Sequence, residues 1–112
     1  MELEHVRAIV TEQFLAERES QEDTWGEQMH HTDQFWTVIL AEEFGEVARE
    51  VYEKNTHKLY NELIQCGAVC MAWAEAIQKR NIDKDIETDT IRVWQLSVEM
   101  DINLVSNINI PH

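Results

Sequence analysis

The stretch DQFWTVILAEEFGEVAREVYEK, residues 33–54, predicts the central helix of an all-α fold. Its apolar residues recur every three or four positions, the spacing typical of one helix face. They are Phe35, Trp36, Ile39, Leu40, Phe44, Val47, Ala48 and Val51. Thr32 or Asp33 can cap the start of this helix, and residues 55–57 interrupt the pattern.

Two further helices are expected, one on each side of this segment. Residues 3–19 carry a partial apolar stripe, and a polar connector with one glycine follows at 20–28. Residues 58–79 carry a longer stripe, and Gly67 within it would allow a neighbouring helix to approach closely. The expected stripe consists of Leu59, Leu63, Cys66, Cys70, Trp73 and Ile77. These elements predict an antiparallel helical bundle over residues 1–88 and a C-terminal extension over residues 89–112.

The C-terminal extension has a different pattern. Apolar and polar residues alternate without interruption from Trp94 to Leu104. Strict alternation is typical of a half-buried β-strand, which would need a partner strand, for example from another subunit. A helix through Ile91, Trp94, Val98 and Ile102 is the alternative.

Composition excludes several classes of function. The chain has 112 residues and a formal net charge of −13, which argues against binding a nucleic-acid backbone. No run of about 18 apolar residues is present, so no membrane span is expected. The N-terminal residues lack the basic and then apolar pattern of a signal peptide, which favours a cytoplasmic location.

Carboxylates occupy apolar faces on two of the predicted helices. At about 100° per residue, Glu43 falls inside the stripe of residues 33–54 with Glu46 beside it, and Glu62 falls inside the stripe of residues 58–79. Glu43 and Glu46 share a face at i, i+3, as do Glu62 and Gln65. Buried carboxylates need a partner, and oxygen ligands on facing helices favour Mg²⁺ or Mn²⁺. If the faces are slightly rotated, these residues would instead lie at the solvated rim.

The same residues carry a resemblance to a known family. Glu42-Glu43-Phe44-Gly45-Glu46 fits the motif EExxE, and Glu62-Leu63-Ile64-Gln65 follows it. With its flanks, from about residue 14 to residue 80, the chain resembles the short MazG-like all-α nucleoside triphosphate pyrophosphohydrolases of phages and bacteria. Gln65 stands where the wider family has Asp.

The resemblance implies Mg²⁺-dependent hydrolysis of a nucleoside triphosphate, ribo or deoxy, to the monophosphate and pyrophosphate. Glu43, Glu46, Glu62 and Gln65 match the family's metal-ligand positions, and the family's fold implies a homodimer or homotetramer. Glu42 could then activate water, Trp25 could stack on the base, and basic side chains could contact phosphates or simply be helix-end charges. These are Lys54, Lys58 and Lys79. The alternatives are a nucleotide-binding regulator without turnover and a structural helical oligomer.

Overall fold

The computed structural model describes residues 1–109, and the side chains of residues 1–102. Three helices make up these residues: α1 (Leu3–Trp25), α2 (Asp33–Tyr52) and α3 (Thr56–Asn109). The prediction of an all-α chain is confirmed for this described part. Within it, no helix is both long enough and apolar enough to cross a membrane. Residues 110–112, the end of the predicted extension, lie outside the described residues.

Local signals set the ends of α1 and α2. Helix α1 continues to Trp25, so the expected connector at 20–28 is wrong over most of its length. It ends at Gly26, which has a φ of 74° that side-chain-bearing residues rarely adopt. Helix α2 begins after Thr32, whose hydroxyl accepts a hydrogen bond from the backbone N–H of Phe35 at 3.2 Å. This confirms the predicted N-cap.

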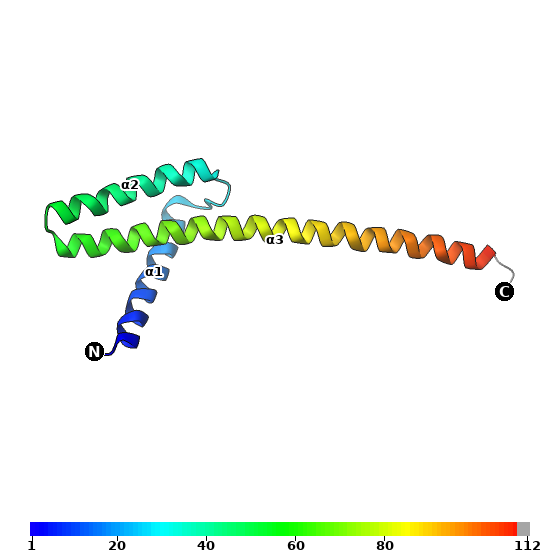
Figure 1. Ribbon diagram of the computed structural model, residues 1–112, viewed down its shortest axis with the longest axis horizontal. Coiled ribbons are helices and arrows are strands. Elements are labelled where there is room, and N and C mark those ends of the chain that lie inside the picture. The colour runs from blue at the N-terminus through cyan, green and yellow to red at the C-terminus, as the bar shows by residue number, and fades with distance from the viewer. Residues whose placement is uncertain (110–112) are drawn as a thin grey trace. The chain divides into compact units, whose positions relative to one another are not determined.

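A tight turn connects α2 to α3. Lys54 has a φ of 58°, and the side chain of Asn55 accepts a hydrogen bond from the N–H of Lys58 at 3.0 Å. The expected break at 55–57 is therefore close to the observed turn. Because the turn is short, α2 lies antiparallel beside the first part of α3 (Figure 1).

The chain divides into two compact units, Met1–Ile77 and a second unit that begins at Gln78. In the first unit, small side chains of α3 pack around Trp36 of α2. The buried cluster contains Trp36, Val69, Ala72 and Ala76, with Met29, Ile39, Leu40 and Trp73 packed against it. No element begins or ends at residue 88, so the domain boundary proposed there stays a prediction.

The apolar stripe predicted for α3 is rotated from the observed one. Leu63 and Ile77 are 48% and 40% exposed, and Cys70 is exposed as well. The face that is buried instead consists of Ile64, Ala68, Val69, Ala72 and Ala76. Small residues are buried here because neighbouring helices approach closely.

Helix α1 crosses α3 and is held by polar contacts (Figure 1). Arg18 is 8% exposed, and its Nε donates to Glu75 Oε1 at 2.6 Å. Gln21 donates to the carbonyl oxygen of Gln65 at 3.3 Å. A Cβ atom on Gly67 would overlap the ring of Phe14, which confirms the predicted close approach at this glycine.

The second unit is helical, so the β-strand expected from Trp94 to Leu104 is wrong and the helical alternative holds. A strand needs a partner for its backbone groups, whereas a helix satisfies them within the segment. Every described side chain from Gln78 to Ile102 is exposed. Alternation on a helix places apolar side chains about 200° apart, so they fall on two opposite faces.

Candidate metal centre

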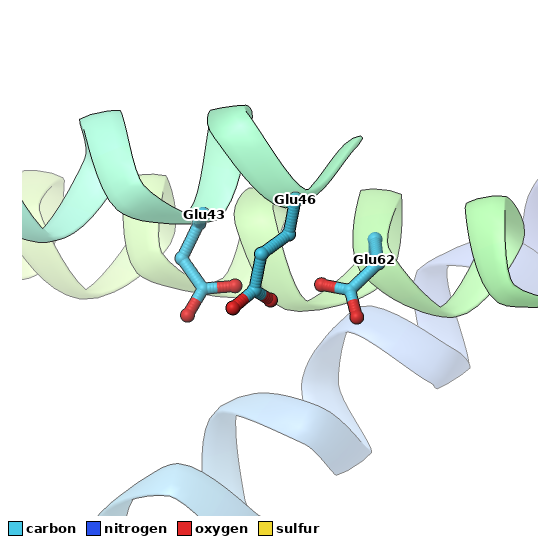
Figure 2. A group of neighbouring side chains, drawn as sticks. All are labelled: Glu43, Glu46 and Glu62. Carbon is cyan, nitrogen blue, oxygen red and sulfur yellow. The ribbon is translucent and has the colours of Figure 1, made fainter. Parts of the chain in front are cut away.

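Two helices of the first unit bring three glutamates together. Glu43 and Glu46 project from α2, and Glu62 projects from α3 (Figure 2). One carboxylate oxygen from each lies within 4.8 Å of the other two. We call Glu43, Glu46 and Glu62 the glutamate cluster. The sequence predicted these three residues as a shared site, and the structure places them side by side (Figure 2).

The sequence positions explain why the carboxylates meet. Glu43 and Glu46 lie three residues apart on one face of α2, and the tight turn after Tyr52 returns the chain along that face. All three side chains are half-buried. The Oε2 atoms of Glu43 and Glu62 are fully covered and have no hydrogen-bond partner within the described residues.

Burial, and then crowded negative charge, raise the pKa values of two carboxyl groups in the cluster. The pKa of Glu62 rises from 4.5 to about 7, first because burial disfavours its charged form, then because it shares a hydrogen bond with Glu46. The charges of Glu46, Glu43 and Glu50 add to the rise. The pKa of Glu43 also rises, mainly through burial and then through the charges of Glu46, Glu17 and Glu42.

No basic side chain compensates this charge in the part of the chain whose side chains are described. None of the three glutamates takes part in the ion pairs that join Arg18 to Glu22 and Glu75, His30 to Glu27, and Lys79 to Asp83. Clustered carboxylate oxygens without a basic partner are a donor set that suits hard divalent cations such as Mg²⁺ and Mn²⁺. The residues present therefore fit the expected ion.

The structure describes the other predicted ligand, Gln65, and the predicted base, Glu42, but tests neither role. Gln65 is half-buried and lines a cavity of about 340 Å³ between α1 and α3. That cavity is also lined by Gln13, Ala16, Glu17, Ser20, Asn61 and Ile64. Glu42 is exposed on α2, so its proposed role in activating water stays a prediction.

The predicted substrate contacts are dispersed over the chain. Lys54 is exposed in the turn, Lys58 is exposed in the first turn of α3, and Lys79 pairs with Asp83 at 2.7 Å in the second unit. Trp25 is 56% exposed at the end of α1. None of these four positions is tested as a substrate contact by the structure.

Trp25 and the buried Trp36 line a small cavity near the end of α1. Its volume of about 30 Å³ is roughly that of one water molecule. The indole N–H of Trp36 is buried there without a hydrogen-bond partner in the described residues. A nucleobase could enter only if the lining side chains moved.

Sequence reasoning missed two acidic residues beside the cluster. Glu17 of α1 lies close enough for its charge to raise the pKa of Glu43. Glu50 of α2 is 8% exposed, and no ion pair joins it to Lys54 four residues later. Its spacing of four from Glu46 and seven from Glu43 was the available signal.

Comparisons with protein-family models, curated proteins and solved structures find no match to this chain.

Proposed function

We propose that this protein is a Mg²⁺-dependent nucleoside triphosphate pyrophosphohydrolase of the MazG-like all-α type. The observation that carries the proposal is the convergence of Glu43, Glu46 and Glu62 from two helices. The resemblance of residues 14–80 adds the reaction class and the bundle type. Such an activity serves to remove or control cellular nucleotides, and Mn²⁺ is the natural alternative ion.

The reaction consumes one water molecule. Its oxygen attacks the α-phosphorus, the bond from that phosphorus to the α–β bridging oxygen breaks, and pyrophosphate leaves. A bound divalent cation would neutralise charge on the phosphate oxygens during this displacement. Glu43, Glu46 and Glu62 would hold the ion, while Glu42, outside the cluster, would accept the proton from water.

Physical chemistry favours a cation at this place over a purely structural acidic cluster. Covered carboxylate oxygens without partners destabilise a fold, and the cluster contains two of them. A cation stabilises such an arrangement, because its attraction replaces the mutual repulsion of the carboxylates. Binding of the ion would thus offset the free-energy cost of bringing the three carboxylates together.

The test is pyrophosphate release from a panel of ribo- and deoxynucleoside triphosphates with Mg²⁺. We expect release by the wild type and none by Glu43→Gln or Glu62→Gln, with both variants folded by circular dichroism. Glu53→Gln removes one exposed charge near the end of α2 and serves as the matched control. Full activity in either cluster variant would overturn the ligand assignment.

A nucleotide-binding regulator is the second candidate, because Gln65 supplies no charge where the wider family has Asp. In that case nucleotides with Mg²⁺ would raise the melting temperature, but no triphosphate of the panel would release pyrophosphate. A structural oligomer would show neither effect.

A homodimer or homotetramer forms part of the proposal. The second unit exposes large apolar side chains on opposite helix faces, Ile82, Ile86, Val93, Leu96 and Met100 on one and Ile91, Trp94, Val98 and Ile102 on the other. Contiguous exposed apolar surface is typical of an interface. Light scattering on the full chain should give a mass two or four times 13.2 kDa, and a monomer would refute this part.

A further inference from the structure

Glu50 is buried in a way that an unpaired carboxylate rarely is. Its side chain lies in the last turns of α2 and is 8% exposed, and its Oε2 is fully covered without a hydrogen-bond partner in the described residues. Lys54, the basic residue one turn later, is exposed in the turn with a φ of 58° and forms no ion pair with Glu50. The fold therefore holds this carboxyl group largely away from water, with one oxygen that has no partner in the described residues.

The position of Glu50 connects it to the glutamate cluster. It lies one helical turn beyond Glu46 and two turns beyond Glu43, which places all three on one face of α2. Its charge acts on Glu62, which projects from α3. Glu50 is not one of the three residues whose oxygens lie within 4.8 Å of one another, and it neighbours that cluster one turn further along α2.

We propose that Glu50 is a fourth carboxylate ligand of the cation site. This inference rests on the proposed function for the presence of a divalent cation, but not on turnover of any nucleotide. Glu43, Glu46, Glu50 and Glu62 carry four formal negative charges when ionised, whereas Gln65 contributes none. Mg²⁺ takes six oxygen ligands, so a further carboxylate is accommodated together with water and substrate oxygens.

The experiment is a calorimetric titration of the full chain with Mn²⁺ in the absence of nucleotide. We expect Glu50→Gln to weaken Mn²⁺ binding by about tenfold or more. Glu53→Gln, the matched loss of an exposed charge just after the same helix, should stay within about twofold of wild type. In the presence of a chelator, Glu50→Gln should melt at a higher temperature than wild type, because it removes a buried charge.

The outcomes separate this inference from the proposed function. Unchanged Mn²⁺ affinity in Glu50→Gln, with binding lost in Glu43→Gln, would overturn the role of Glu50 and leave the cluster as the metal site. Weakened binding in Glu50→Gln without hydrolysis of any triphosphate would support Glu50 and overturn the hydrolase. Absence of Mn²⁺ binding by the wild type would overturn both.

Glu50→Asp covers the case in which the glutamine variant does not fold. It keeps the charge and shortens the side chain by one methylene, so the carboxylate no longer reaches the same point. Weaker Mn²⁺ binding than wild type supports the proposal, and wild-type affinity refutes it.

Discussion

Replacing Glu62 with glutamine should stabilise the metal-free protein at pH 8 while removing its response to Mg²⁺. The pKa of Glu62 is raised from 4.5 to about 7 by burial, by its hydrogen bond with Glu46 and by neighbouring charges. Between these pH values the folded chain holds a proton that the unfolded chain has released. The free energy of unfolding therefore falls as pH rises from about 4.5 to about 7 and then levels off.

The structure bounds the size of this effect. A rise of the pKa from 4.5 to about 7 corresponds to an upper limit of about 3 kcal/mol. Glu62 is only half-buried, and solvent screening reduces the expected effect to roughly 1–2 kcal/mol. Glu62→Gln should therefore be more stable than wild type by about that amount at pH 8 and nearly equal to it at pH 4.5.

The assay is urea unfolding followed by circular dichroism, with a chelator, at several pH values and one fixed protein concentration. A difference between variant and wild type that does not change with pH would refute the reasoning, as would a variant less stable at pH 8. Saturating Mg²⁺, about 100 times the Kd, should then stabilise the wild type by about 2.7 kcal/mol and Glu62→Gln much less. Glu53→Gln should follow the wild type in both series.

Four further substitutions test the packing of the first unit by urea unfolding. Gly67→Ala should destabilise the protein by about 1–3 kcal/mol, because the added Cβ would overlap the ring of Phe14. Gly45→Ala should stabilise it by about 0.5–1 kcal/mol, because the added Cβ meets open space. A Gly67→Ala variant more stable than the Gly45→Ala variant would contradict the observed packing. Glu75→Ala leaves the buried guanidinium of Arg18 without its 2.6 Å partner and should cost about 2 kcal/mol; no loss would mean that this pair contributes nothing. Thr32→Ala removes the N-cap hydrogen bond of α2 and should cost about 1 kcal/mol, which an unchanged unfolding midpoint would disprove.

Helix α2 was predictable because its signals are local. A capping residue, a regular apolar spacing and an interruption at 55–57 lie within one stretch, and each acts on backbone groups close by. Glu43, Glu46 and Glu62 were found for a related reason, since a carboxylate inside an apolar face requires a partner. The spacing of glutamates within the apolar faces was therefore enough to show that these carboxylates need a partner, before their positions in space were known.

The buried face of α3 was not predictable from hydrophobicity alone. Large residues such as Leu63 and Ile77 dominate any apolar stripe, yet Ala72 and Ala76 are the ones buried, at 3% and 1% exposed. Closely packed helices need small side chains between them. The distance between two helices depends on tertiary contacts, which the sequence of one helix does not show. The same limitation hid Glu50, whose burial follows from the return of α3 along α2.

The C-terminal alternation was ambiguous on physical grounds. Residues two apart lie on the same face of a strand but about 200° apart on a helix, so alternation also describes a helix with two apolar faces. Sequence periodicity alone does not distinguish a half-buried strand from a helix whose two apolar faces both pack against other chains. The helical outcome changes the expected assembly from strand pairing to packing of helix faces.

The tight turn at Lys54 also bears on the order of folding. It joins α2 directly to α3, so the cluster residues are close neighbours along the chain and meet within a single helical hairpin. Hairpins of this kind have low contact order and form rapidly. The hairpin can thus gather its acidic side chains early in folding, before α1 docks, and a divalent cation present in the folding buffer should accelerate that step.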